Sequence, residues 1–139
     1  MIALNYPATR IAVSKNLSLK TAQKENVLWI ATDIQETLQG LTFTIINTAT
    51  HEQETVTTAI VGEHNVTNLL LATATAYHEG IPLRDIAFRI RTLQPAESRL
   101  VTHTTAQGIT IINDAYSANP VGVVSALKVL GMYQTGKRL

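Results

Sequence analysis

Two patterns meet at Gly62-Glu63-His64-Asn65-Val66-Thr67-Asn68: strand-like alternation precedes this segment and a helical pattern follows it. From Asn65 to Glu79 apolar residues recur along one side, and Gly80 stands where a left-handed C-terminal cap belongs. The two asparagines are three positions apart, so their carboxamides face the same side of the first turn. A carboxamide can pair with the edge of an adenine ring. The alternative is that one asparagine only caps the helix.

The residues ahead of this segment predict an antiparallel hairpin. Apolar and threonine residues alternate with a period of two over 41–45 and again over 56–60, which indicates two strands with one solvated face. A preceding strand is predicted at Val27–Ile30 and a short helix over Thr9–Lys20. After Pro82, apolar residues at helical spacing predict a second amphipathic helix to Leu93. Its arginines are interpreted as solvated: Arg84, Arg89 and Arg91.

A break at Gln94–Ser98 is the best candidate for a domain boundary. Beyond it, Leu100–Thr104 and Ile109–Asn113 flank a Gln107-Gly108 turn, which predicts a second hairpin. A polar loop and a last helix, about Val121 to Tyr133, follow.

Composition narrows the class of protein. The chain has 139 residues, 45% of them hydrophobic, no cysteine and a formal net charge of +1. The length fits one domain with a sizeable core, the charge is too small for a nucleic-acid footprint, and no thiolate chemistry is possible. No apolar run approaches the length of a membrane span, and the start does not resemble a signal peptide. We therefore expect a cytoplasmic globular protein.

Several familiar motifs are rejected. Gly131 to Arg138 has the spacing of a phosphate-binding loop, but Arg138 replaces the Ser or Thr and a helical pattern precedes it instead of a strand. We interpret it as a helix end followed by basic residues. The histidines show no metal-binding spacing, so no metal site is predicted from them: His51, His64, His78 and His103.

A polar segment, Asp114-Ala115-Tyr116-Ser117-Ala118-Asn119-Pro120, follows the last predicted strand directly. An acidic residue at a strand end can accept hydrogen bonds from ribose hydroxyls. The alternative, which the segment taken alone favours, is an ordinary turn with Pro120 opening the helix.

In this order and spacing, the segments resemble the Mur ligases. That family carries a G-x-H-N-V-x-N segment opening an alanine-rich helix, a Gly-Arg-Leu or similar triplet, and a strand that runs into D-[SA]-Y-N-A-N-P. The matches here are Gly62–Asn68, Ser98-Arg99-Leu100 and Asp114–Pro120, with a looser one at Leu4-Asn5-Tyr6. Ser98 and Ser117 depart from the usual glycine and asparagine, and Asn5-Tyr6-Pro7 lacks an aspartate pair.

The resemblance implies residue roles and ligands. Asn65 and Asn68 would hold the adenine of ATP, Asp114 the ribose, and Arg99 the phosphate side. The residues near the substrate cleft would be Tyr116, Ser117 and Asn119. Catalytic residues are not assigned, and Mg²⁺ would act with ATP in the intact enzyme.

The resemblance also implies a fold, α/β, and a division of the chain. Residues 1–95 would be the C-terminal part of a central ATP-binding domain, with antiparallel hairpins and two helices. Residues 96–139 would begin a Rossmann-like C-terminal domain with a hairpin and a helix. The ATP-cradling loop, the magnesium carboxylate and a modified lysine of the family have no counterpart here, so we expect the chain alone to be inactive. A chain cut through two domains would also expose apolar surface, so we expect it to be prone to self-association.

The implied reaction is ATP-dependent addition of D-alanyl-D-alanine to the UDP-N-acetylmuramoyl tripeptide in peptidoglycan synthesis. Two alternatives stay open. One is a non-catalytic nucleotide-binding or interaction module. The other is a ligase of the folate polyglutamate or cyanophycin type, which the amino acids at positions 116–120 disfavour.

Overall fold

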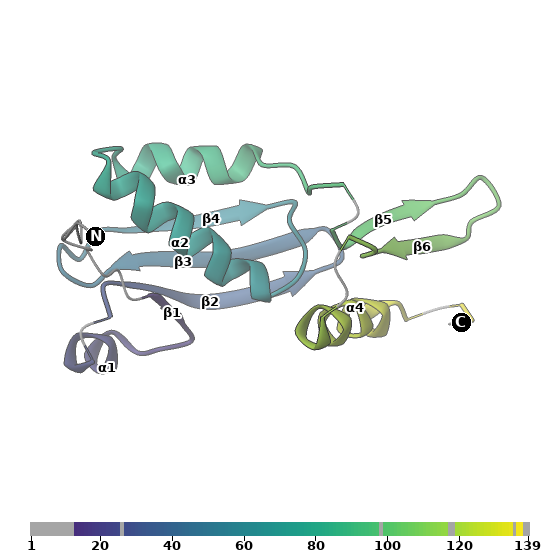
Figure 1. Ribbon diagram of the computed structural model, residues 1–139, viewed down its shortest axis with the longest axis horizontal. Helices are drawn as coiled ribbons and strands as arrows, with labels where there is room; N and C mark the ends of the chain where they lie inside the picture. Colours follow the sequence, from purple (N-terminus) through teal and green to yellow (C-terminus); the bar gives the residue numbers. More distant parts are fainter. Residues whose placement is uncertain (1–12, 26, 98, 117–118, 135, 138–139) are drawn as a thin grey trace, which may run out of the picture.

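The main sheet has four strands in the order β1-β2-β3-β4 (Figure 1). They are β1 (Val13–Lys15), β2 (Trp29–Thr37), β3 (Gly40–Asn47) and β4 (Gln53–Thr58). β1 pairs with β2 in parallel, and the other pairs are antiparallel. This computed structural model describes residues 13–25, 27–97, 99–116, 119–134 and 136–137. The matches at Leu4-Asn5-Tyr6, Ser98 and Ser117 lie outside the described residues.

The hairpin of β3 and β4 confirms the alternation of apolar residues and threonine. Leu41, Phe43 and Val56 point into the core and are fully buried. On the opposite face the threonines pair across the strands, with hydroxyl contacts of 3.1 Å between Thr42 and Thr57 and 3.0 Å in the next pair. A residue period of two separates these faces because successive side chains of a strand point to opposite sides.

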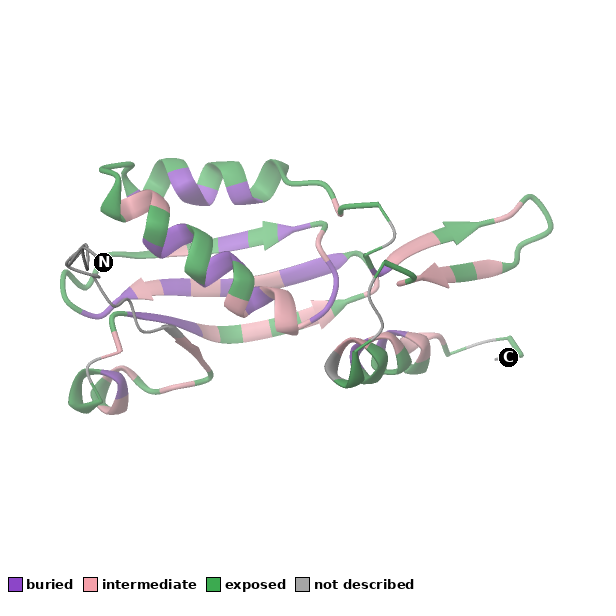
Figure 2. Ribbon diagram, in the orientation of Figure 1, coloured by how far each residue is buried: buried purple, intermediate pink, exposed green. Residues whose placement is uncertain are grey.

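Two helices cover the apolar face of the sheet: α2 (His64–His78) and α3 (Leu83–Thr92) (Figures 1 and 2). Both helices were predicted from their spacing and both are confirmed. Their buried residues join those of β2, β3 and β4 in one core, and the Trp29 and Tyr77 rings meet edge to face with centroids 5.0 Å apart. The core stabilises the start of α2, where the decisive motif lies.

The C-terminal segment has its own small sheet. β5 (Val101–Thr104) and β6 (Thr110–Asn113) form an antiparallel hairpin, and α4 (Pro120–Met132) follows. A second buried cluster, made by Val61, Leu100 and Val129, joins this segment to the end of the main sheet. The expected α/β fold with two hairpins is confirmed, whereas a domain boundary at residue 95 stays a prediction.

The N-terminal predictions need correction. The helix expected over Thr9–Lys20 is wrong in its described part, because β1 occupies Val13–Lys15 and α1 (Leu19–Lys24) starts later, capped by Ser18. Strand pairing with β2 overrides the local preference there. β2 also runs on to Thr37, past the predicted end at Ile30. An irregularity between Thr32 and Gln35 interrupts the period of two that would have revealed it.

The three arginines of α3 are exposed, as expected: Arg84, Arg89 and Arg91. Arg91 also has a partner that the sequence did not predict, because its Nη2 donates a 2.8 Å hydrogen bond to the Thr55 carbonyl of β4. None of the helices in the described ranges has the length and apolar character to cross a membrane.

Candidate functional site

A pocket of about 220 Å³ lies where the first turn of α2 meets the C-terminal segment. Four of its lining residues carry predicted nucleotide roles, namely Asn65, Asn68, Arg99 and Asp114. His64, Leu100, Asn119 and Gly122 complete the lining. The four residues with predicted roles are up to 49 positions apart in sequence (65 to 114) and nevertheless converge on one hollow. We refer to it as the junction pocket.

A second hollow of about 350 Å³ shares Asn65, Asn68 and Arg99 with the junction pocket. Its remaining lining is largely apolar or uncharged: Ile60, Gln94, Pro95 and Ala96. We refer to it as the side pocket. Because three polar side chains border both hollows, one ligand could place an apolar ring in the side pocket and polar groups in the junction pocket.

Hydrogen bonds fix the orientation of the two asparagine carboxamides. Asn65 Nδ2 donates to the Val61 carbonyl at 2.8 Å, and Asn68 Nδ2 donates to Asn65 Oδ1 at 3.1 Å. Neither side chain caps α2, because the capping position is Glu63 and it makes no side-chain cap bond. The capping alternative is therefore wrong. Among the described residues, Asn68 Oδ1 has no hydrogen-bond donor, so this carboxamide keeps an acceptor and one N–H for a ligand.

Asp114 follows β6 and binds the backbone on the other side of the junction pocket. Its Oδ1 accepts a 3.1 Å hydrogen bond from the Leu100 N–H, which holds Leu100 at a φ of 52°. That leaves Oδ2, which faces Gly122 across the pocket lining. The turn after β6 uses Asn113 instead, whose Oδ1 accepts from the Ala115 N–H at 3.1 Å. The turn alternative is thus correct for the segment, but the turn does not use the Asp114 carboxylate, whose Oδ2 remains available to a ligand.

Asn119 caps α4, as the helix-start alternative implies. Its Oδ1 accepts from the Gly122 N–H at 2.9 Å, and Pro120 occupies the first turn. Asn119 also lines the junction pocket. Tyr116 does not line it, and instead packs against Arg99, whose guanidinium carbon lies 4.2 Å from the ring centroid.

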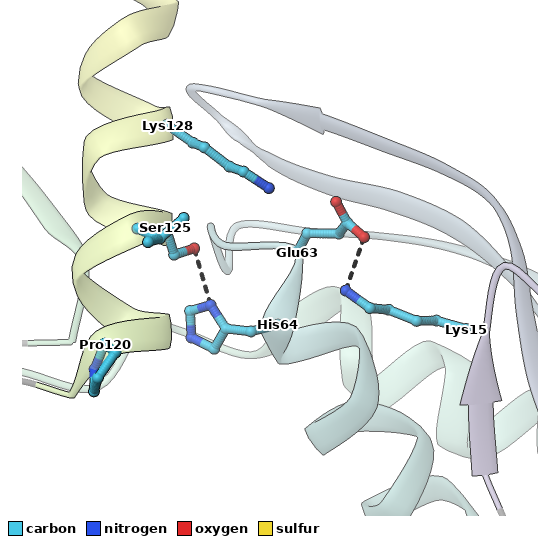
Figure 3. A pocket seen from close by; sticks show the side chains of 7 residues that line it. Lys15, Glu63, His64, Pro120, Ser125 and Lys128 are labelled. Carbon is cyan, nitrogen blue, oxygen red and sulfur yellow. Dashed lines mark hydrogen bonds and ion pairs between the residues drawn. The ribbon is translucent and has the colours of Figure 1, made fainter.

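A third hollow, of about 360 Å³, lies on the other side of His64 (Figure 3). Lys15 Nζ forms a 2.8 Å ion pair with Glu63 Oε1, and Lys128 reaches toward the same carboxylate from α4. The hydrogen bond from Lys15 lowers the pKa of Glu63, and the Lys128 charge adds to that effect. His64 Nδ1 lies 3.0 Å from Ser125 Oγ, which connects α2 to α4.

These contacts were not predicted. The sequence gives His64 no predicted role beyond the lack of metal-binding spacing, and no pattern singles out Lys15 or Ser125. The partners are separated by 48 and 61 positions, so no local pattern could have paired them. His64 lines both the junction pocket and this third hollow.

The chemistry of the junction pocket fits an adenine nucleotide better than a metal ion. Carboxamides, one carboxylate oxygen and a guanidinium suit a base, a hydroxyl and a phosphoryl group in turn. In the part of the chain that the structure describes, no three His, Asp or Glu side chains are grouped so that they could hold a metal ion. No step of a mechanism is therefore assigned to magnesium on these residues.

Comparisons with known proteins give consistent matches. Residues 5–76 match the family described as the Mur ligase middle domain. The chain is 33% identical over 103 residues to UDP-N-acetylmuramoyl-tripeptide--D-alanyl-D-alanine ligase of Haemophilus influenzae, covering 74% of this chain and 22% of that protein. It is 33% identical over 97 residues to the enzyme of the same name from Bacillus subtilis, covering 70% and 20%.

Solved structures show the same relationship. A crystal structure of MurF from Acinetobacter baumannii superposes with a TM-score of 0.71 at 26% identity, covering 89% of this chain and 30% of that one. The chain spans about a fifth of the length of the curated relatives it matches.

Proposed function

Because this chain belongs to the Mur ligase family, we propose that it supplies the adenine and ribose side of the ATP site of an amide-bond ligase. The observation that carries the proposal is the hydrogen-bond chain from the Val61 carbonyl through Asn65 to Asn68. A carbonyl can only accept, so it sets the orientation of the first carboxamide, which sets the second. Asn68 is left with one acceptor and one donor on the ligand side.

That pairing matches adenine and not guanine. Adenine offers an amino donor beside a ring-nitrogen acceptor, and a carboxamide can engage both together. Guanine offers two acceptors at the corresponding edge, which would oppose Asn68 Oδ1. The side pocket, with Ile60 and Pro95 in its lining, gives such a ring an apolar surface.

The remaining nucleotide groups fit the junction pocket. Asp114 Oδ2 is the carboxylate oxygen that the Leu100 N–H does not use, and it suits a ribose hydroxyl donor. Arg99 borders both hollows and makes no ion pair with any described residue, so its charge is available to a phosphoryl group.

For the whole enzyme we propose the reaction named for the relatives in Haemophilus influenzae and Bacillus subtilis. The carboxylate of a UDP-linked muramyl tripeptide attacks ATP and forms an acyl phosphate. The amine of D-alanyl-D-alanine then displaces phosphate through a tetrahedral intermediate, so that one amide bond forms and ADP and phosphate leave. Cationic groups such as Arg99 stabilise the charge that develops on phosphoryl oxygens.

The nucleotide site is tested by titrating the chain with ATP and with GTP, followed by the NMR signals of the asparagine side-chain amides. We expect ATP to shift the Asn65 and Asn68 signals and GTP to leave them unchanged. Asn68→Asp removes the donor, and should weaken ATP binding at least about fivefold. Gln53→Glu, at the far end of β4, changes the charge equally and should leave binding unaltered. Absence of any ATP-dependent shift in the wild-type chain would refute the site.

The reaction is tested on the protein that carries this chain, with the UDP-linked tripeptide, ATP and one amine substrate at a time. Phosphate release with D-alanyl-D-alanine, and not with D-glutamate or diaminopimelate, is the expected result. A preference for either of those two amino acids, which the names of other similar relatives contain, would overturn the substrate assignment. ATP binding without release in any mixture would favour the non-catalytic module.

A further inference from the structure

Tyr116 is an exposed aromatic residue whose ring packs on a cation at the edge of the candidate site. The guanidinium carbon of Arg99 lies 4.2 Å from the ring centroid, well inside the range of cation–π attraction. Tyr116 is 70% exposed and is absent from the lining of the pockets that Arg99 borders. Its contact with the site therefore runs through Arg99.

Among the described residues, Tyr116 makes the main side-chain contact of Arg99. Its backbone N–H donates to the Ala96 carbonyl at 3.1 Å, which fixes the main chain but not the long side chain. Among the described residues it forms no ion pair, and Asp114, in the same pocket, bonds to the Leu100 N–H instead. An arginine side chain left free would lose up to about 2 kcal/mol of rotamer entropy on binding an anion.

We propose that Tyr116 is a positioning residue, which holds the Arg99 guanidinium at the border of the junction and side pockets so that it meets a phosphoryl group of the bound nucleotide. This inference rests on the proposed nucleotide site. The family resemblance implies only that Tyr116 lies near the substrate cleft, whereas the stacking gives it a defined task toward another residue. The aromatic ring is what the task requires, because the attraction acts on the ring face and not through the hydroxyl.

The test compares Tyr116→Phe with Tyr116→Leu in calorimetric titrations with ATP and with adenosine. Tyr116→Phe keeps the ring and should bind ATP as the wild type does. Tyr116→Leu should weaken ATP binding about two- to fivefold, the range expected for an exposed cation–π contact. Adenosine affinity should be equal in all three proteins, because adenosine lacks the phosphoryl groups that Arg99 would meet.

An Arg99→Ala background separates positioning from a direct contact of Tyr116 with the ligand. There, Tyr116→Leu should cause no additional loss, whereas a further loss, or an equal loss for adenosine, would overturn the proposal. Equal ATP affinity of the Phe and Leu variants would do so as well.

A measurement without nucleotide distinguishes this inference from the proposed function. The Arg99 Nε–H signal should be shifted upfield by the Tyr116 ring current in the wild type and in Tyr116→Phe, and should lose that shift in Tyr116→Leu. A wild-type chain that binds ATP but lacks this pattern refutes the positioning role alone. A wild-type chain that shows the pattern but binds no ATP refutes the nucleotide site, and the positioning role with it.

Discussion

The main sheet and the C-terminal segment differ in how many of their apolar side chains are buried. In the main sheet, β2, β3 and β4 share one large core with α2 and α3. In the C-terminal segment, the buried cluster is the small one of Val61, Leu100 and Val129. Figure 2 shows β5, β6 and α4 mostly in the colours of intermediate and exposed residues. Several large apolar side chains there are exposed, among them Ile109 at 60% and Leu127 at 61%. The candidate site lies where these two regions meet, so one wall is supported by the large core and the other by the small cluster.

A matched pair of core truncations tests this difference most strongly. Leu41 and Leu100 are both buried, one in each cluster. Leu41→Ala should destabilise the whole protein by about 3–5 kcal/mol, because a cavity opens in a core that cannot collapse around it. Leu100→Ala should cost about 2–3 kcal/mol, with the loss concentrated in β5, β6 and α4. Urea denaturation gives the first quantity and amide hydrogen exchange locates the second. Equal global losses would contradict the comparison.

Glycine substitutions test the contact between the two regions at the start of α2. Gly62 has a φ of 97°, and an added Cβ would lie 2.6 Å from the His64 ring and 3.0 Å from Leu100. Gly80 has a similar φ of 87° with nothing within 4 Å of such an atom. Gly80→Ala should therefore cost about 1–2 kcal/mol from backbone strain alone, and Gly62→Ala should cost more. Thermal melts measure both, and identical shifts would mean that the crowding at Gly62 relaxes without cost.

The hydrogen bond between His64 and Ser125 should contribute less. Ser125 is only 8% exposed, and its hydroxyl joins α4 to the first turn of α2. Ser125→Ala should cost about 1 kcal/mol and should speed hydrogen exchange in α4 more than in α2. Ser14→Ala is the control, because among the described residues the Ser14 hydroxyl donates to the Lys15 carbonyl of its own strand. Faster exchange in both helices alike would show that the two regions open together.

The smallest effect is expected from the ion pair of Lys15 and Glu63. The folded-state pKa of Glu63 lies below its ordinary value of 4.5 because Lys15 bonds to the carboxylate. Its contribution is therefore complete above that value and is lost as the pH falls through the lower folded pKa. Both side chains are about one-third exposed, so the gain should stay below about 1 kcal/mol. Melts of Glu63→Gln and wild type from about pH 3 to 7 should differ at the upper end and converge at the lower.

Local patterns explain which elements could be predicted from the sequence. The β3–β4 hairpin, α2 and α3 follow from residue periods of two and 3.6, and Gly80 and Pro82 mark the end of one helix and the start of the next. β1 could not be predicted because its three described residues are too few to show a period, and its strand conformation follows from pairing with β2. The second half of β2 escaped because Asp33, at a φ of 54°, breaks the alternation.

The residues of the candidate site could be predicted from the sequence, but the contacts between them could not. Local patterns and the family resemblance pointed to Asn65, Asn68 and Asp114, and the resemblance alone added Arg99. The structure brings all four to one pocket. The sequence could not predict the contact of Asp114 with Leu100 or that of Arg99 with Tyr116, because both depend on how two loops pack. His64 and Ser125 likewise meet only after α4 folds back on α2.

Arg91 has a consequence for how molecules of this chain meet one another. β4 is an outer strand of the described sheet, and such a strand exposes unpaired carbonyl and amide groups that can recruit a strand from another molecule. By donating to the Thr55 carbonyl from α3, Arg91 occupies one of those groups and places a positive charge beside the strand. The β4 edge is thus a poorer template for the addition of a strand from another molecule.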